Sequence, residues 1–315
     1  MTLDCLASLA QLNYRNYRII VVDNDSNDGT AEAVRQRYPV TVIENGANLG
    51  FAEGNNIGIA RALADGADYI LLLNNDTIVG PEMLQELIEV AESGADIGIV
   101  GPVVYYFDDP EVIWSAGNAV DTTTGEVRRL LAHTRGGPGV APYEADYITG
   151  CALCIKRQVI ERIGLMDARY FLYYEEVDWC TRARESGYRV VVVPKAPIWH
   201  KVSATIKQNS PAIAYYMTRN IFLLLKKNSR GYNRARILTM AYLRHLRILA
   251  AHTLRALNRP SGFNRRARTL GLRDAFLGRW GKMGADVAAV CLTPKASKDA
   301  GKVRAEVRLD GVEAS

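Results

Sequence analysis

The sequence has few cysteines, no long apolar run and, in one stretch, almost no acidic residues. Five cysteines among 315 residues cannot form a fully paired disulfide framework, and a chain of this length can bury a core without one. We therefore expect a reducing, cytosolic compartment. Cys151 and Cys154 lack a second cysteine pair or a close histidine that would complete a zinc site. We interpret them as buried core thiols.

Two further absences concern membranes. No run of about 18 apolar residues is present, so we expect no membrane-spanning helix. The first 11 residues lack the basic leader of a secretory signal, so we expect no signal peptide.

Acidic residues are scarce in the last third of the chain. Residues 1–200 carry 16 Lys/Arg and 28 Asp/Glu, a net charge of −12, whereas residues 201–315 carry 23 and 6, a net charge of +17. Between Lys201 and Lys282, 18 basic residues face a single acid, Asp274. This asymmetry indicates an anionic partner, which could be membrane lipid, a phosphorylated acceptor or nucleic acid.

Strand and helix signals alternate over residues 1–104, which predicts a doubly wound, mostly parallel α/β sheet flanked by helices. The expected strands are 17–22, 40–44, 69–73 and 97–100, and the expected helices are 4–12, 28–38, 55–64 and 81–93. Because the chain opens on a helix, either the sheet starts at Tyr17 or the given start lies downstream of the real one.

The rest of the chain divides into four parts. We expect short antiparallel strands and loops over 105–148, then helices at 157–163 and from about 176, and a strand at 189–193 ending before Pro194. A helical pattern covers about 210–257. The predicted organisation is an α/β domain over 1–204, a basic helical region over 205–282 and a loosely ordered tail over 283–315.

A buried strand over 69–73 runs directly into Asn74, Asn75 and Asp76. In parallel α/β sheets the ligand crevice lies at the carboxyl ends of the strands. Side-chain oxygens at that place can hold Mg²⁺ or Mn²⁺ together with a diphosphate, or they can cap the next helix.

Two other segments offer polar side chains after a strand. Asp23, Asp25 and Ser26 follow the first strand and could contact a base or a ribose; an Asx turn with a helix cap would explain the later Asp28 and Thr30, but not Asp23 and Asp25. A glycine-rich loop over 45–56 would let the backbone approach a ligand closely, although such a loop is a weak signal alone.

An acidic cluster lies at 170–179. Glu175, Glu176 and Asp178 stand among aromatic residues, an environment that raises a carboxyl pKa toward the working range of a general base. His200 follows a later strand, and a lone histidine is more often structural than catalytic.

Taken together and in this order, these segments resemble the family-2 inverting glycosyltransferases of the GT-A fold, especially the bacterial rhamnosyltransferase-like branch. The resemblance covers about residues 3–282. It is carried by VVDNDSNDGT, ENGANLGFAEGNNIGI, LLLNNDT, ITGCALCIKR, IGLMDARYFLYYEEVDWCTRARESGYRVVVVP and the closing WH.

The resemblance implies roles for the polar residues. Asp76 would be the last acid of the family's Asp-x-Asp metal motif, in which Asn74 replaces the first acid, and His200 matches a second ligand of Mg²⁺ or Mn²⁺. Glu175-Glu176 resembles the family's Glu-Asp pair, with Glu176 as catalytic base and Asp178 in reserve. The sugar nucleotide would be bound by Asp23, Asp25, Ser26, Asn48, Gly50, Asn55, Asn74 and Asn75.

The resemblance also implies a reaction. The chain would move a rhamnose-like sugar from a nucleoside-diphosphate donor, dTDP-rhamnose first and a UDP-sugar next, to a saccharide or polyprenyl-linked acceptor in cell-envelope polysaccharide synthesis. It also implies a first strand that this chain lacks, as a start site placed too late would explain. The basic helical segment mixes aromatic, leucine and Arg/Lys residues, so we expect one of two roles for it: attachment to the cytoplasmic membrane face, or a helical bundle that covers the sheet and leaves its basic side solvated.

Other functions remain open at this point. These are transfer of galactofuranose or another hexose from a UDP-sugar, a nucleotidyltransferase, and a non-catalytic protein that binds lipid or nucleic acid through the basic segment. A nucleotidyltransferase usually brings a glycine-rich, Lys/Arg-bearing phosphate loop near its start, which is absent here. A binding protein would leave the acidic strand ends unexplained, so we expect no nucleic-acid partner.

Overall fold

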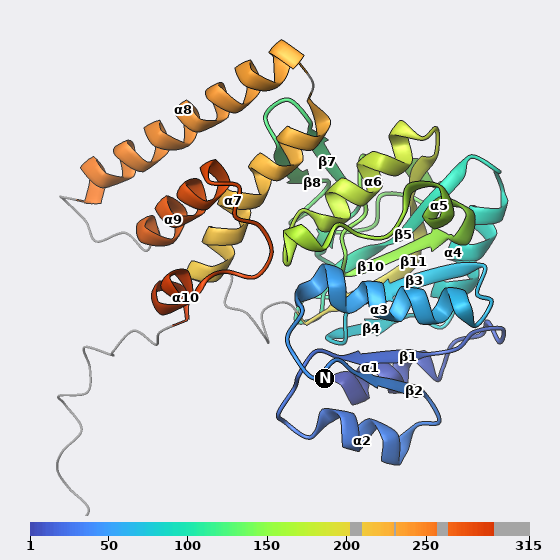
Figure 1. Cartoon of the computed structure of the whole chain (residues 1–315). Helices are drawn as coiled ribbons and strands as arrows, with labels where there is room; N and C mark the ends of the chain where they lie inside the picture. The colour runs from blue at the N-terminus through green and yellow to red at the C-terminus, as the bar shows by residue number, and fades with distance from the viewer. Residues whose placement is uncertain (202–209, 230, 257–263, 293–315) are drawn as a thin grey trace, which may run out of the picture.

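A central sheet is covered by helices on both faces, and a group of four further helices lies beside it (Figure 1). The computed structural model describes residues 1–201, 210–229, 231–256 and 264–292. The helices are α1 Thr2–Leu9, α2 Thr30–Arg37, α3 Gly50–Ala64, α4 Met83–Glu92, α5 Arg157–Ile163, α6 Glu175–Glu185, α7 Pro211–Asn228, α8 Gly231–Ala256, α9 Arg265–Phe276 and α10 Ala285–Cys291, with a 3-10 turn η1 at Ala168–Tyr170.

The strands follow the predicted order, with additions. The buried strand that ends in polar residues has the predicted bounds, Tyr69–Leu73. The strands are β1 Ile20–Asp23, β2 Thr41–Glu44, β3 Tyr69–Leu73, β4 Thr77–Val79, β5 Ile97–Tyr106, β6 Ile113–Ser115, β7 Asn118–Asp121, β8 Glu126–Arg129, β9 Tyr143–Glu144, β10 Ala152–Lys156 and β11 Arg189–His200.

The pairing of the strands confirms the α/β class but corrects the expectation of a mostly parallel sheet. The seven-stranded sheet has the order β3-β10-β5-β11-β4, with β6 and β9 attached at the side. β11 runs parallel to β5, whereas β10 is antiparallel to both β3 and β5, and β4 is antiparallel to β11. β1 and β2 form a separate parallel pair. β10 was not predicted; it follows the loops and short strands of residues 107–151 and lies between β3 and β5.

Alternate residues of the sheet enter two hydrophobic clusters, one on each face. On β11, Val190 and Val192 pack with α3, α5 and α6, while Val191 and Val193 pack with α1 and α4. This alternation follows from the two-residue period of a strand. All five cysteines are buried and free, which confirms the prediction of buried core thiols for Cys151 and Cys154.

Several predicted boundaries are wrong; the strand expected at 97–100, for example, continues to Tyr106 as β5, and two others bear on the site. α3 begins at Gly50 rather than at residue 55, so that the second half of the glycine-rich segment is helical. β11 continues past Pro194 to His200, because a register shift between Val193 and Pro197 accommodates the prolines at an irregularity. This extension brings His200 to the same end of the sheet as the loop after β3.

The C-terminal helices share the main core. Ile221, Phe222 and Leu225 of α7 belong to the same cluster as Trp179 of α6 and Val190 of β11. The predicted boundary at residue 204 lies outside the described residues. The expectation of a loose tail after Lys282 is wrong for α10, whose Val287 is fully buried, and residues 293–315 lie outside the described part.

Candidate active site

Asp76 and His200 meet because β4 pairs with the end of β11. The antiparallel register sets Thr77 opposite His200, which brings the preceding residue, Asp76, beside the imidazole. The distance from Asp76 Oδ1 to His200 Nε2 is 3.1 Å, and the backbone N–H of Lys201 donates to the Asp76 carbonyl at 2.8 Å. Two residues 124 positions apart in sequence thus form one polar pair.

The Asp76–His200 pair is enclosed but incompletely bonded. The two side chains are 12% and 10% exposed, yet neither Asp76 Oδ1 nor His200 Nδ1 makes a well-directed hydrogen bond to any described residue. Trp114 closes the site with its ring edge-on to the imidazole, at 4.8 Å between centroids. Buried polar atoms without hydrogen bonds are rare and destabilising, so His200 Nδ1 is available for a further partner, and Asp76 Oδ1, whose contact is the 3.1 Å approach to His200 Nε2, can accept another.

The chemistry of this pair fits a divalent cation. A carboxylate oxygen and an imidazole nitrogen suit Mn²⁺ well, whereas Mg²⁺ prefers an all-oxygen set that phosphate oxygens would have to complete. Within the described residues no three His, Cys, Asp or Glu side chains cluster as metal ligands, so the protein alone does not form a full cage. A cation here would need oxygens from a bound phosphate.

The segment after β1 forms a compact turn. Asp23 is buried at the strand end and its Oδ2 accepts the backbone N–H of Ser26 at 3.1 Å. Asp25 and Ser26 are exposed, and Asp25 has a positive φ of 71°. The turn therefore presents Asp25 and Ser26 to solvent while Asp23 supports the turn from below.

Asn24 joins this turn to the glycine-rich loop and was missed by the sequence analysis. Its Oδ1 accepts the backbone N–H of Leu49 at 3.0 Å, and its Nδ2 donates to the Gly50 carbonyl at 3.0 Å and to Asn48 Oδ1 at 3.3 Å. An asparagine between two aspartates at a strand end was the available signal. Asn24 thereby brings the two predicted nucleotide-binding segments together.

The other residues of the glycine-rich segment differ in availability. Asn48 is exposed and its Oδ1 accepts the Gly50 N–H at 3.0 Å. Gly50 has φ +84°, and a Cβ there would lie 2.4 Å from the Phe171 carbonyl oxygen, so no other residue fits. The amide of Asn55 donates back to the Phe51 carbonyl at 2.8 Å inside α3.

The two asparagines before Asp76 hold the loop in different ways. Asn74 bonds through its backbone, which accepts the Thr77 hydroxyl at 2.7 Å and donates to the Cys151 carbonyl at 2.8 Å. Asn75 turns its amide toward α1 and donates to Thr2 Oγ1 at 2.9 Å. The side chain of Asn75 is thus engaged away from the Asp76–His200 pair.

The two glutamates occupy the first turn of α6. Burial, together with the neighbouring Glu176, raises the pKa of Glu175 well above its ordinary value, and burial raises the pKa of Glu176 to about 7. In each residue Oε2 has no partner in the described part of the chain. Because the two carboxyl groups influence each other, they release their protons in linked steps, and the pair as a whole retains one proton near neutral pH.

Asp178 differs from the two glutamates by being fully engaged. It is 1% exposed, and its Oδ1 lies 2.7 Å from Lys227 Nζ while its Oδ2 accepts Arg182 Nε at 2.9 Å. The Tyr170 hydroxyl donates to the same carboxylate at 3.3 Å. An aspartate held by two cations is suited to fixing α6 rather than to taking up a proton.

All these loops converge on residues 147–151. Phe51 of α3 lies against Gly150, where a Cβ would approach the phenyl ring to 2.9 Å, and the Asn74 N–H is bonded to the Cys151 carbonyl. Burial raises the pKa of Cys151, with a further contribution from the Asp76 charge, and burial raises the pKa of Tyr147, with a further contribution from Glu176. The Asp76–His200 pair and the Glu175–Glu176 pair therefore lie on either side of residues 147–151, at the same end of the sheet.

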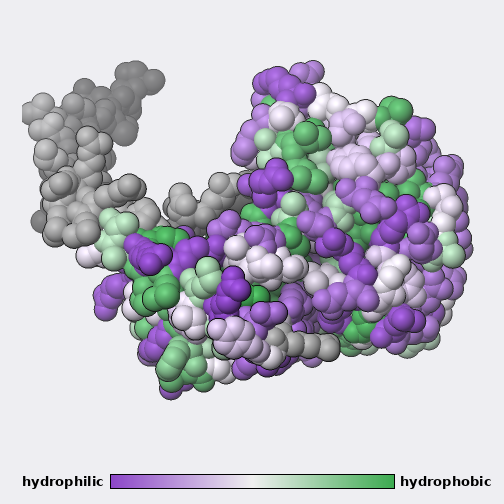
Figure 2. Space-filling model, turned by 90° about the horizontal axis from the view of Figure 1, so that it is seen from above, coloured by the Kyte–Doolittle hydropathy of each residue, from purple (hydrophilic) through white to green (hydrophobic). Residues whose placement is uncertain are grey.

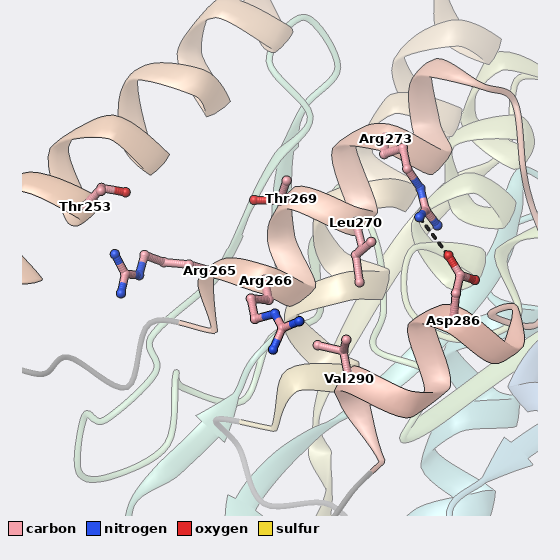
Figure 3. Close-up of a pocket in the computed structure, with 8 residues that line it drawn as sticks. All are labelled: Thr253, Arg265, Arg266, Thr269, Leu270, Arg273, Asp286 and Val290. Atoms are coloured by element: carbon pink, nitrogen blue, oxygen red, sulfur yellow. Dashed lines mark ion pairs between the residues drawn. The ribbon is translucent and has the colours of Figure 1, made fainter.

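Two cavities lie away from this convergence. One of about 480 Å³ is lined by residues of β7, β9 and β11, including Arg189. The other, of about 550 Å³, lies between α8, α9 and α10, where Arg265 and Arg266 extend from the start of α9 and Arg273 pairs with Asp286 at 2.7 Å (Figure 3). The larger cavity is thus basic and distinct from the strand-end site.

Comparison with known proteins gives a family and a fold. The family model described as "Glycosyl transferase family 2" matches residues 1–164. The chain is 28% identical over 253 residues to an N-acetylglucosaminyl-diphospho-decaprenol L-rhamnosyltransferase of Mycobacterium tuberculosis, covering 73% of this chain and 81% of the relative. It is 26% identical over 230 residues to the dTDP-rhamnosyl transferase RfbF of Shigella flexneri, covering 70% and 75%.

Solved structures agree with the fold. The mannosyltransferase PcManGT from Pyrobaculum calidifontis, in complex with GDP-Man and Mn²⁺, superposes with a TM-score of 0.52 at 17% identity, over 88% of this chain and 82% of that one. GalNAc-T7 with UDP, GalNAc and Mn²⁺ gives a TM-score of 0.53 at 17% identity, over 68% and 43%. The predicted GT-A fold is confirmed.

Proposed function

The chain belongs to glycosyl transferase family 2, and we propose that it transfers a rhamnose-like sugar from a nucleoside-diphosphate donor to a hydroxyl of a lipid-linked or saccharide acceptor, with inversion. One observation carries the proposal. The Asp76–His200 pair and Glu176, all with unpartnered buried atoms, flank the same segment at the carboxyl end of the sheet. The Asp76–His200 pair can bind a cation together with a diphosphate, and Glu176 can accept a proton.

The donor side uses the loops that Asn24 joins. Asp25, Ser26 and Asn48 are exposed and are assigned to the nucleoside, with Asp23 and Gly50 shaping the loop beneath it. Asp76 and His200 would hold Mg²⁺ or Mn²⁺, which would offset the charge that develops on the leaving diphosphate. dTDP-rhamnose is the first candidate donor, because both curated relatives named above are rhamnosyltransferases.

Glu176 acts as the general base. It removes the proton from the acceptor hydroxyl while that oxygen attacks the anomeric carbon from the face opposite the diphosphate. The bond from the anomeric carbon to the diphosphate oxygen breaks, and the nucleoside diphosphate leaves with that electron pair. A base with a pKa near 7 is half deprotonated at neutral pH and still accepts a proton in the transition state.

The acceptor side is assigned to the basic helices. On α8, Met240, Leu243 and Leu246 are 60%, 48% and 54% exposed, and in the sequence Arg244 lies between the two leucines and Arg247 follows them. Apolar and hydrophilic residues interleave over the helical part of the surface at the left of Figure 2. None of the described helices is long and apolar enough to cross a bilayer. Peripheral binding to anionic lipid is the mode that this surface supports.

The reaction can be tested directly with the purified chain. dTDP-rhamnose, UDP-sugars and GDP-sugars are compared for their effect on thermal unfolding with Mn²⁺ or Mg²⁺, and then for transfer to a polyprenyl-diphosphate-linked amino sugar. We expect dTDP-rhamnose to raise the midpoint most and to be the donor that is turned over. A larger effect of a UDP-sugar would favour the hexosyl alternative, and no effect of any sugar nucleotide would overturn the proposal.

Membrane attachment has its own test. The protein is sedimented with vesicles of anionic or neutral lipid at low and high salt. We expect binding to anionic vesicles that weakens with salt, because screening reduces the attraction of the arginines. Equal recovery in the supernatant with both lipids would remove the membrane assignment and leave the transfer reaction unaffected.

A further inference from the structure

α7 carries two adjacent polar residues that are completely buried. Arg219 is 1% exposed and Asn220 is 0% exposed, although arginine and asparagine are usually found at surfaces. They lie beneath residues 169–174, the loop that leads into α6 and its two glutamates. Burying such groups is favourable only when their hydrogen bonds are made, so their partners explain why they are there.

Asn220 bonds to the backbone of this loop. Its Nδ2 donates to the carbonyls of Tyr170 at 2.9 Å, Leu172 at 2.8 Å and Tyr173 at 2.8 Å. One amide group thus gathers three carbonyls within four residues. The arrangement leaves little freedom to the backbone immediately before Glu175.

Arg219 orients the asparagine and adds bonds of its own. Its Nε donates to Asn220 Oδ1 at 2.9 Å, its Nη2 to the Tyr170 carbonyl at 3.0 Å and its Nη1 to the Gly281 carbonyl at 2.7 Å. Because the Asn220 oxygen is occupied by Arg219, its NH₂ group must face the loop. The two residues act as one unit.

The buried guanidinium of Arg219 is connected to an acid, Asp274, through Tyr215, and Asp274 also pairs with Arg273 at 2.8 Å. Arg219 Nη1 lies 3.4 Å from the Tyr215 hydroxyl, which donates to Asp274 Oδ2 at 2.8 Å. Asp274 is 2% exposed and is the one acid of the basic stretch between Lys201 and Lys282. The hydrogen-bond chain from Arg219 through Tyr215 to Asp274 explains why this one acid lies in the basic stretch.

The loop held by this unit has an unfavourable backbone. Phe171, Tyr173 and Tyr174 have φ of 65°, 69° and 76°, values that side chains other than glycine rarely adopt. Such conformations persist only where the surroundings impose them, and they concentrate at sites where geometry matters. Three of them directly precede Glu175 and Glu176.

From this arrangement we infer that Arg219 and Asn220 are positioning residues that fix the loop over 170–174 and thereby place the Glu176 carboxylate for the transfer reaction. The inference rests on the proposed function. It means that α7 positions the catalytic base, in addition to any role of the C-terminal helices in binding an acceptor or a membrane.

The donor loop has an anchor of its own, which makes the inference testable. Asn24 fixes residues 48–50 by the bonds described above, and one main-chain bond, from Phe51 N–H to the Phe171 carbonyl at 2.6 Å, connects this loop to the loop over 170–174. Because the Asn24 bonds do not involve α7, loosening the loop over 170–174 should disturb Glu176 more than the nucleotide site.

The test uses two variants and a matched control in the full chain. Asn220→Asp keeps the shape but replaces the NH₂ donor with an anion beside three carbonyls, and Arg219→Lys keeps the charge but loses the fork of donors. Lys226→Ala, on the exposed last turn of α7, is the control. The measurements are kcat and KM for the donor, and amide hydrogen exchange over residues 45–50 and 170–176.

We expect Asn220→Asp to lower kcat about 100-fold, the scale of a displacement of about 1 Å in a catalytic group. Arg219→Lys should lose less, donor KM should stay within about threefold, and exchange should quicken over 170–176 but not over 45–50. Lys226→Ala should match the parent. If Asn220→Asp does not fold, the inference is tested with Arg219→Lys, by the same comparison of kcat with donor KM and of hydrogen exchange in the two loops.

A parent-like kcat in both variants would overturn the inference, as would a loss confined to donor KM. A parent protein that turns over no sugar nucleotide would overturn the proposed function and the catalytic half of the inference with it. The exchange measurement would then still decide the structural half: unchanged protection over 170–176 would overturn it, and lost protection would support it.

Discussion

The buried carboxylates of this protein fall into two groups. Asp76, Glu175 and Glu176, at the strand ends and the start of α6, each keep an oxygen without a well-directed partner among the described residues. Asp178 and Asp274, which face the C-terminal helices, have both oxygens engaged by cations or hydroxyls. Burying an unpaired carboxylate destabilises a fold, so we infer a role in the reaction for the first group. The second group, whose oxygens are all engaged, stabilises the structure around the site.

The sharpest test of this contrast is Glu176→Gln. The change removes the base but keeps the shape, so kcat should fall about 10²- to 10⁴-fold while donor affinity is retained. The midpoint of thermal unfolding should not fall, because a buried, unpaired carboxyl is being replaced by a neutral amide. The measurement pairs steady-state transfer kinetics with a melting curve, and near-parent turnover would show that another group is the base.

Asp178→Asn should show the opposite pattern. It leaves Lys227 without its closest carboxylate partner and weakens the bond from Arg182, so we expect about 3 kcal/mol of lost stability. Denaturant unfolding measures this loss. Part of the activity should remain at a temperature where the variant is folded; complete loss of kcat in a fully folded variant would return Asp178 to the position of candidate base.

The metal role of the Asp76–His200 pair predicts a smaller, recoverable defect. In His200→Ala the Mn²⁺ concentration for half-maximal activity should rise at least about tenfold, or about 1.4 kcal/mol. Titration of activity with Mn²⁺ and Mg²⁺ after treatment with a chelator provides the measurement. Activity that is unaffected by the chelator in the parent would contradict the assignment.

The pH dependence follows from the raised pKa of Glu176. Since the base must be deprotonated, kcat should rise about tenfold between pH 6 and pH 8, across a pKa of about 7. Stability should move the other way. The carboxyl of Glu176 releases its proton near pH 4.5 in the unfolded chain but only near pH 7 in the folded protein. The free energy of unfolding therefore decreases as the pH rises from 4.5 toward 7. A profile that is flat from pH 6 to 8 would contradict the base assignment.

Glu175→Gln should have the smallest effect. Burial and the neighbouring Glu176 raise the pKa of Glu175, which favours its protonated form, and glutamine resembles a protonated glutamate. We expect kcat to fall no more than about threefold, in the same assay as for Glu176→Gln. A loss as large as that of Glu176→Gln would show that the two glutamates cannot be separated into a base and a neutral neighbour.

The sequence predicted the strand-end residues but could not predict how the strands bring them together. The bounds of β3 and the polar loop after it followed from a run of five apolar residues. The closeness of Asp76 and His200 depends on the antiparallel pairing of β4 with an extension of β11 beyond two prolines, and no local pattern encodes a pairing between such distant segments.

The supporting residues were hidden for a different reason. In the sequence, Arg219 and Asn220 belong to a helix of mixed apolar and basic residues, where an arginine normally lies at the surface. Their burial depends on the packing of α7 against η1 and α9, which only the structure reveals. Asn24 was overlooked because the two aspartates beside it offered the more familiar chemistry.

The participation of Phe222 to Leu225 in the main core bears on how relatives can be recombined. A chimera that exchanges the C-terminal helices before α7 would import foreign side chains into the cluster around Trp179 and Val190. A junction after Asn228 would keep α7 with its own sheet, but it would still replace Ala241, Leu272 and Ala275 of the same cluster and Asp274, the hydrogen-bond partner of Tyr215. A chimera among relatives should therefore carry the sheet and the helices α7 to α9 as one unit.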